Sequence, residues 1–391
     1  MQLRRCAVLW LEPREVAHFE LEDLLSGGTG VVSAIRWFAH APHLAEAVEV
    51  DAEAAALLGT LSPTDWVFAS DILAAHAQGI VDAMLAHGLV LSSEGTSQRD
   101  RDEQFRAQHW HGLSSIWHAA SRWSGLDAAG EVKEAGLDTS VGLRTAYGPP
   151  PPMLHECGDA SDRIALTRAA RTPLDELLDA RSTCRNFDTT KELPQALFAN
   201  VLERTFGARG QVHAADDFDV LKKTSPSGGA LHPTEAYLIV QRVEGISPGL
   251  YHYRAGDHAL QPLPPVDDLG YLAWIAVAGQ QWFADAHVLV ALAPRFARNF
   301  WKYRNHPKAY RVTILDIGHL SQTLFLSATD LGLGAYITAA INEVDIERAF
   351  GLTSYVDGPL AVCGFGLRAD TMTTSEFDPN RKIWTRKADA G

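Results

Sequence analysis

The sequence predicts an α+β fold, because segments typical of helices and of strands are intermixed without regular alternation of one strand and one helix. The second half of the chain carries this prediction: it contains short alternating or apolar segments, a turn between two of them, and one long apolar helical segment. Neither a Gly-x-Gly-x-x-Gly motif after a strand nor a Walker-type loop occurs. We therefore favour α+β over a doubly wound nucleotide-binding fold.

Individual segments of the second half support this class. Residues 235–243 alternate like a strand, residues 249–263 resemble a hairpin around a Gly-Asp turn, and residues 287–294 and 360–368 are typical of buried core strands. Residues 312–334 are apolar on nearly all sides and predict a buried helix. Gly318 lowers the helix propensity there, which indicates that another backbone approaches closely.

Length and composition restrict the class of protein. A chain of 391 residues usually forms more than one domain, and its 46% hydrophobic content argues against global disorder. The formal net charge of −14 disfavours nucleic acid as a partner. The four cysteines fall outside any CxxC pattern, so neither a metal site nor a disulfide framework is predicted.

The N-terminal stretch "MQLRRCAVLWLEPREV" lacks the cleavage-site pattern of a signal peptide, and no segment is long enough to span a bilayer. We expect a cytoplasmic protein without a membrane partner.

The first part of the chain predicts a separate domain. Residues 51–61, 65–77 and 79–93 give three short helical patterns, the last followed by a strand-like end, which together suggest a winged-helix-like domain. The candidate recognition region carries Asp71 and Asp82, so peptide or protein binding is favoured over DNA binding. Four consecutive prolines, residues 149–152, predict an extended linker. The expected domains are therefore 1–148, a linker at 149–174, and 175–391.

A segment between these regions, "QHWHGLSSIWHAASRW", places Trp110 and Trp117, and likewise His111 and His118, seven residues apart on similar faces of a helix. Such a stripe is compatible with a ligand site, but no further ligand stands at a suitable spacing. We favour an amphipathic packing helix.

Two segments carry candidate ligand-binding groups. In "LLDARSTCRNFD", two guanidiniums and two hydroxyls within five residues either form an anion site or are ordinary cationic residues at a helix end. In "KTSPSGGALHPTEAY", small residues allow a flat ligand to approach the backbone, whose N–H groups at Ser227, Gly228 and Gly229 are candidate donors. Alone, this segment is also compatible with an ordinary turn.

Together with "GLYHY", "KYRNHPKAYRVTILDIGHLSQTLFLSATDLGLGA" and "PLAVCGFG", these motifs resemble the FMN-dependent nitroreductase superfamily, and most of all its SagB-type (McbC-like) peptide dehydrogenases, over residues 175–391. The resemblance implies a central, mostly antiparallel sheet flanked by helices, an FMN cofactor and a homodimer. The helix that contains Gly318 is the expected dimer interface.

The resemblance also implies which residues bind FMN. The segment that holds the phosphate and ribityl oxygens corresponds to Arg181, Ser182, Thr183 and Arg185. The loop that lines the ring corresponds to Pro226, Ser227 and Gly228. Ala339 or Ala340 corresponds to the donor of an N–H towards flavin N5, and Arg381 to a C-terminal basic residue that reaches the phosphate.

Lys302 and Tyr303 match the Lys-Tyr motif regarded as the catalytic base of azoline oxidases. A lysine acts as a base near neutral pH only when burial or a nearby cation lowers its pKa. The family usually has Leu before this Lys, whereas Trp301 stands here. The alternative is an ordinary pair on a helix surface.

The implied function is oxidation of azoline to azole in a ribosomally synthesised peptide, with the precursor peptide as substrate and a cyclodehydratase or another maturation enzyme as a partner. The N-terminal region then resembles a clamp for the peptide. The alternatives are an NAD(P)H-dependent nitro- or quinone reductase, another flavin-dependent peptide dehydrogenation or reduction, and a flavin-free scaffold protein.

Overall fold

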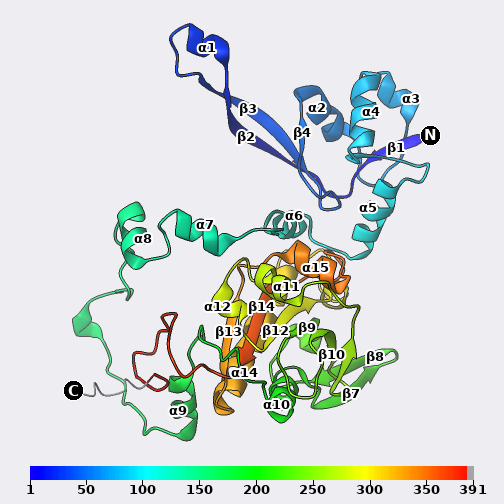
Figure 1. Ribbon diagram of the computed structural model, residues 1–391. Helices are drawn as coiled ribbons and strands as arrows, with labels where there is room; N and C mark the ends of the chain where they lie inside the picture. Colours follow the sequence, from blue (N-terminus) through cyan, green and yellow to red (C-terminus); the bar gives the residue numbers. More distant parts are fainter. Residues whose placement is uncertain (385–391) are drawn as a thin grey trace. The chain divides into compact units, whose positions relative to one another are not determined.

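The computed structural model describes residues 1–384, and the chain divides into two compact units (Figure 1). Unit 1 consists of residues 1–122 and 296–311, and unit 2 of residues 123–295 and those from 312 onward. This division is not colinear with the sequence, whereas the expected domains were contiguous. Residues 296–311 belong to unit 1 because their aromatic side chains pack there, as described below.

Unit 1 contains two small sheets and short helices. Its elements are β1 (Gln2–Arg5), β2 (Trp10–Phe19), α1 (Leu21–Leu25), β3 (Val31–His40), β4 (Val48–Val50), α2 (Ala52–Thr60), β5 (Val67–Phe68), α3 (Ala69–Leu73), α4 (Gln78–Ala86), β6 (Val90–Ser92), α5 (Ser97–Ala107), α6 (Gly112–Ala120) and α13 (Phe296–Phe300).

The three helices expected in the N-terminal region are present as α2, α3 and α4. The strand-like end expected after them is present as β6, which pairs with β1 at the start of the chain. The sheet order is β5-β1-β6, and fully buried side chains such as Leu3, Leu57 and Leu89 form the core beneath it. The N-terminal residues therefore complete this domain.

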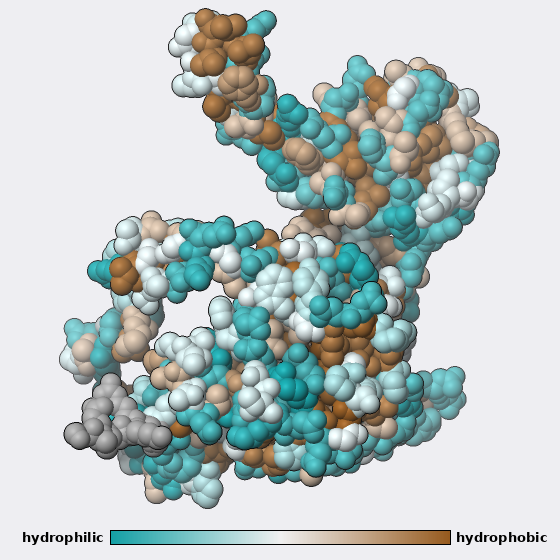
Figure 2. Space-filling view, viewed as in Figure 1, coloured by the Kyte–Doolittle hydropathy of each residue, from teal (hydrophilic) through white to brown (hydrophobic). Residues whose placement is uncertain are grey.

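The long hairpin of β2 and β3 was not expected from the sequence. The two strands pair over their whole length, from Trp10 opposite His40 to Phe19 opposite Val31. Their apolar side chains lie on an exposed face, and the hydrophobic patch at the end of the hairpin includes Phe19 and Leu25 (Figure 2). A strand whose apolar face is not covered by the core gives no reliable burial pattern.

Unit 2 contains the main sheet and the longest helix. Its elements are α7 (Ala128–Glu134), α8 (Ser140–Tyr147), η1 (Ala160–Asp162), α9 (Pro173–Ala180), α10 (Gln195–Phe206), β7 (Gly210–Ala215), β8 (Phe218–Lys222), η2 (Gly228–Ala230), β9 (Thr234–Val240), β10 (Gly249–Arg254), β11 (Ala259–Pro262), α11 (Leu269–Ala276), α12 (Gln281–Ala284), β12 (Val288–Pro294), α14 (Ala309–Asp330), β13 (Gly334–Thr338), α15 (Glu343–Phe350) and β14 (Ala361–Gly366), with the first turn of α14 in unit 1.

The six-stranded sheet of unit 2 has the order β11-β10-β9-β12-β14-β13, and all neighbouring strands are antiparallel. Every residue of β12 is buried, as the apolar run predicted, and the hairpin of β10 and β11 lies where the Gly-Asp turn placed it. The α+β class is confirmed.

Helix α14 differs from the expected fully buried helix. Leu324 and Ala328 on one side have no exposed surface and belong to the core, whereas Leu315 on the other side is 57% exposed. Gly318 is also exposed, and no atom of the described residues lies within contact distance of the space that a Cβ would fill. The expected close approach at Gly318 does not occur within this chain.

The four prolines belong to a stretch, residues 149–172, that is exposed throughout and contains only the short η1. Among the described helices, none combines the length and the apolar character needed to cross a membrane.

Candidate active site

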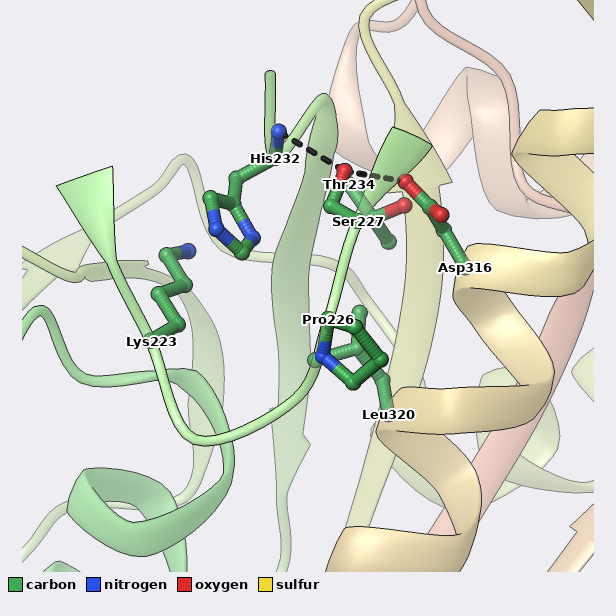
Figure 3. A pocket seen from close by; sticks show the side chains of 7 residues that line it. All are labelled: Lys223, Pro226, Ser227, His232, Thr234, Asp316 and Leu320. Atoms are coloured by element: carbon green, nitrogen blue, oxygen red, sulfur yellow. Dashed lines mark hydrogen bonds between the residues drawn. The ribbon is translucent and has the colours of Figure 1, made fainter. Parts of the chain in front are cut away.

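The loop between β8 and β9 is fixed by one carboxylate of α14 (Figure 3). The hydroxyl of Ser227 donates to Asp316, and the Gly228 N–H donates to Asp316 Oδ1 at 3.1 Å. The His232 N–H donates to Ser227 Oγ at 3.0 Å. The Gly228 N–H, which the sequence suggested as a ligand donor, is therefore used together with the Ser227 hydroxyl to hold the loop against the helix.

Asp316 is only 4% exposed. Burial raises the pKa of its carboxyl above the usual value, while the hydrogen bonds from Ser227 and Gly228 and the nearby His319 act in the opposite direction. Asp316 thus makes hydrogen bonds that partly compensate for its burial, and it positions the backbone of the loop.

Gly228 is required by its distance from α14. A Cβ at this position would lie 2.1 Å from Cγ1 of Val312, far closer than van der Waals contact. The glycine therefore allows the loop to pack directly on the helix.

Replacing Gly228 by alanine is expected to destabilise the protein by about 1–3 kcal/mol, because the added methyl group overpacks the contact with Val312. Chemical denaturation measures this loss. Gly256→Ala is the matched control, since a Cβ at Gly256 meets no atom within contact distance. The double variant Gly228→Ala, Val312→Ala should recover part of the loss, and no recovery would contradict the steric explanation.

The segment with the two predicted arginines leaves α9 and runs along β13. Helix α9 begins with a capping box at Thr172 and ends at Arg181, so the expected helix end is present. Beyond it, the Cys184 N–H donates to the Ala335 carbonyl oxygen at 2.8 Å. This contact fixes residues 181–185 beside the strand that leads to Ala339 and Ala340.

Both guanidiniums of this segment lie over aromatic rings. Arg181 is 5.2 Å from the ring centre of Phe325, and Arg185 is 5.9 Å from that of Phe283. Among the described residues, neither arginine has a carboxylate within ion-pair distance. Two positive groups are therefore held in place without an anionic partner from residues 1–384.

The C-terminal segment packs against the same region through residues that the sequence did not reveal. Glu376 forms an ion pair with Arg368 at 2.9 Å and accepts hydrogen bonds from the backbone N–H groups of Arg185 and Asn186. Arg368 in turn donates to Ser182 Oγ at 3.2 Å. Ser182, a predicted ligand contact, thus contacts the C-terminal segment.

Arg381 lines the same hollow as Arg368, Glu376 and Trp384. Arg381, the predicted phosphate contact, therefore belongs to the C-terminal segment that packs on residues 182–186. A single carboxylate in a loop gives no sequence signal for such a role, which is why Glu376 was missed.

The two alanines after β13 have different surroundings. The Ala340 N–H donates to Thr338 Oγ1 at 3.2 Å, and the Ala340 carbonyl oxygen accepts from Gln280 Nε2 at 3.0 Å. Ala339 is exposed, and within residues 1–384 its N–H has no acceptor. Of the two predicted donors towards a ligand, Ala339 is the one that fits.

The predicted ligand-binding residues of unit 2 thus form two groups along α14. One group, with the two arginines, lies at Phe325, and the other, the Ser227 loop, lies at Asp316. Nine residues of helix correspond to about 14 Å. Within one chain the two groups are separate.

Lys302 and Tyr303 lie in unit 1, directly after α13. Lys302 is exposed, and its Nζ lies 5.6 Å from the ring centre of Tyr303. Trp301 beside them is also exposed. The Asn305 N–H donates to the His109 carbonyl oxygen at 2.9 Å, which ties this segment to the chain before α6.

An aromatic cluster holds the Lys-Tyr segment from both sides. Trp110, 4% exposed, has ring contacts with Phe296 at 4.6 Å and Phe300 at 4.7 Å, before the pair. His118, 1% exposed, is hydrogen-bonded through Nδ1 to the hydroxyl of Tyr310, after the pair, at 2.9 Å. Trp110 and His118 are thus packing residues, but Trp110 precedes α6 and Trp117 is 56% exposed, so the expected shared helix face of the two tryptophans is wrong.

Comparisons with known proteins identify the family of the domain that contains the main sheet. Residues 178–367 match the Nitroreductase family. The trifolitoxin-processing protein TfxB of Rhizobium leguminosarum bv. trifolii is 30% identical over 149 residues, which cover 36% of this chain and 38% of TfxB. The microcin B17-processing protein McbC of Escherichia coli is 25% identical over 150 residues, 37% of this chain and 54% of McbC.

The matched region therefore spans about half or less of these two curated relatives. A chain in the solved structure of the E. coli microcin synthetase McbBCD complex with truncated pro-MccB17 bound has the same fold, with a TM-score of 0.51 and 19% identity. That alignment covers 71% of this chain and 100% of the other. The expected resemblance is confirmed for this part of the chain: residues 178–367 form a domain of the nitroreductase family.

Proposed function

We propose that this protein is an FMN-dependent dehydrogenase that oxidises azoline to azole in a ribosomally synthesised peptide. The observation that carries the proposal is the pair of guanidiniums, Arg181 and Arg185, held over aromatic rings without a carboxylate partner in residues 1–384 of a nitroreductase-family chain. The peptide as substrate is supported by the similarity to two processing proteins, TfxB and McbC.

The residues of unit 2 fit the chemistry of FMN. Arg181, Arg185 and Arg381 would bind the phosphate, because guanidiniums bind phosphate oxygens in pairs. The exposed Ala339 N–H would donate towards the ring, whereas Ser227 and Gly228 would contribute loop shape more than hydrogen bonds. When bound, FMN accepts a hydride.

The oxidation removes a proton from one ring carbon of the azoline and a hydride from its neighbour, two hydrogens in total. In the proposed mechanism the neutral amine of Lys302 takes the proton and becomes an ammonium, next to the Tyr303 ring. Because Lys302 is exposed in this chain, the substrate has to cover it and exclude water. Dioxygen is the proposed final electron acceptor.

The proposed assembly is a cytoplasmic homodimer formed through α14. The outward face of α14 carries Ile314, Leu315 and Gly318. This face is apolar, and the absence of a side chain at Gly318 allows a second copy to approach closely. A dimer would also allow the arginine group of one chain and the Ser227 loop of the other to act on one ligand. We include a cyclodehydratase or another maturation enzyme among the proposed partners, and the N-terminal region as the part that binds the precursor peptide.

The test is incubation of the purified yellow holoprotein with the cyclised precursor peptide encoded near its gene. We expect the loss of two hydrogens per azoline by mass spectrometry, without added NAD(P)H. A protein that does not bind FMN would contradict the enzymatic function. A protein that binds FMN, oxidises NAD(P)H and leaves the peptide unchanged would instead be a reductase.

A further inference from the structure

Lys223 is a buried cation for which the described chain provides no ion-pair partner. It follows β8 directly and is 6% exposed. Among residues 1–384, no carboxylate lies within ion-pair distance of its ammonium group, and no hydrogen-bond acceptor contacts it. The ammonium keeps a small accessible surface, but an unpaired charge on a side chain that is otherwise buried is costly, so such a residue needs an explanation.

The carboxylate whose charge acts on Lys223 is already engaged. Glu235 at the start of β9 forms an ion pair with Arg295 at 2.8 Å and contacts His252 Nε2 at 3.2 Å. Burial lowers the pKa of Lys223; Glu235 acts in the opposite direction and Arg295 in the same one. Glu235 therefore moderates the cost of burying Lys223 without pairing with it.

A second buried group that lines the same hollow also lacks a hydrogen-bond partner. Thr234 is 3% exposed, and its hydroxyl makes no hydrogen bond to any described residue. Lys223 and Thr234 line one hollow together with Pro226, Ser227, His232, Asp316 and Leu320 (Figure 3). Its volume of about 10 Å³ admits one water-sized group.

We propose that this hollow is a ligand subsite, in which Lys223 and Thr234 together bind one oxygen or nitrogen atom that carries negative charge. The ammonium supplies charge and the hydroxyl a second hydrogen bond, a combination suited to an anionic acceptor. The wall formed by Pro226 and Ser227 is the loop proposed to lie against the flavin. The acceptor atom belongs either to the flavin ring or to the peptide substrate. Both alternatives rest on the proposed function.

The first arm of the test measures the stability of the FMN-free protein. Lys223→Met removes the unpaired charge and keeps the volume, so its Tm at neutral pH should exceed that of the wild type by about 3 °C or more. Lys222→Met is the matched control, since Lys222 is exposed. Thr234→Val, which removes the unpaired hydroxyl, should also raise the Tm.

The gain should depend on pH in a defined way. Glu235, Arg295, His232 and Asp316 are the charged and titratable groups around Lys223, and its pKa is lower in the folded protein than in the unfolded chain. Between the pKa of Lys223 in the folded protein and its pKa in the unfolded chain, the folded protein binds fewer protons than the unfolded chain. The stability of the wild type therefore rises with pH in this range. The advantage of Lys223→Met should be greatest below the lowered pKa and vanish above about pH 10.4.

The second arm measures binding. If the flavin supplies the acceptor, Lys223→Met should weaken FMN binding at least about tenfold in a fluorescence titration. If the substrate supplies it, FMN binding should persist while binding of the cyclised precursor peptide weakens by the same factor. A Tm below that of the wild type for both Lys223→Met and Thr234→Val, or unchanged binding of both probes, would overturn the proposal. A wild type that does not bind FMN would overturn the proposed function but not the stability result.

Discussion

Lys302→Ala is expected to lower kcat for azoline oxidation by about 10²–10⁴-fold, the range that a positioned acid or base contributes. The side chain is exposed in the chain and lies beside the Tyr303 ring, so its removal takes away the proton acceptor without opening a cavity. None of the groups proposed to bind FMN is changed. The visible absorption of bound FMN should therefore remain, and single-turnover mass spectrometry should show the loss of two hydrogens slowed by this factor.

The neighbouring residues provide the controls for this experiment. Tyr303→Phe keeps the ring beside the Lys302 ammonium and removes the hydroxyl. A slower reaction in this variant would therefore show that the hydroxyl, and not the ring alone, assists the proton transfer to Lys302. Lys308→Ala removes another exposed lysine of the same segment and should leave kcat within about twofold. Equal rates in the wild type and in Lys302→Ala would show that the base lies elsewhere, and the buried Lys223 would then be the first residue to test.

Much of the main sheet of unit 2 could be predicted because its central strands β12 and β14 are buried on both sides. In β12 every residue is apolar or buried, so its pattern does not depend on distant parts of the chain. The exposed hairpin of β2 and β3 has no such pattern. Helix α14 was predicted as a helix, but its apolar residues did not reveal that Ile314 and Leu315 remain outside the core of their own chain.

The candidate site could be predicted only as separate segments. The residue types near Arg181 and Ser227 indicated ligand binding, but not that the Ser227 hydroxyl binds Asp316 or that Ser182 accepts a hydrogen bond from Arg368. Such contacts join residues far apart in the chain and leave no local pattern. Thr234 is a further case, since a threonine at the start of a strand is unremarkable until its hydroxyl is found without a partner.

The Lys-Tyr segment belongs to unit 1, although it lies in sequence within the predicted catalytic domain. The segment interrupts the catalytic half in sequence, yet it is packed by Trp110 and His118 from the N-terminal part. If the N-terminal region binds the precursor peptide, recognition and the proposed base belong to the same unit of the chain. Peptide binding would then bring the substrate and the base together, which is the kind of positioning that raises reaction rates.

Trp110→Ala should release this segment. Truncation of a buried tryptophan costs about 3–5 kcal/mol, and here the lost contacts include those with Phe296, Phe300 and Tyr310. Chemical denaturation should show this loss in the free energy of unfolding. Limited trypsin digestion, identified by mass spectrometry, should cut after Lys302 and Arg304 faster than in the wild type, because both are exposed on a loosened segment.

Two further variants separate release of the segment from general destabilisation. Trp66→Ala also truncates a tryptophan of unit 1, one that packs under Arg4 and Arg99 away from the cluster, so it should lower stability without faster cleavage at Lys302. Tyr310→Phe removes the hydrogen bond to His118 while keeping the ring and should cost about 1 kcal/mol. If Trp110→Ala lowers kcat with FMN retained and Trp66→Ala does not, the cluster positions the base. Equal cleavage rates in all three variants would instead mean that the segment is held by other contacts, and that the aromatic cluster only stabilises unit 1.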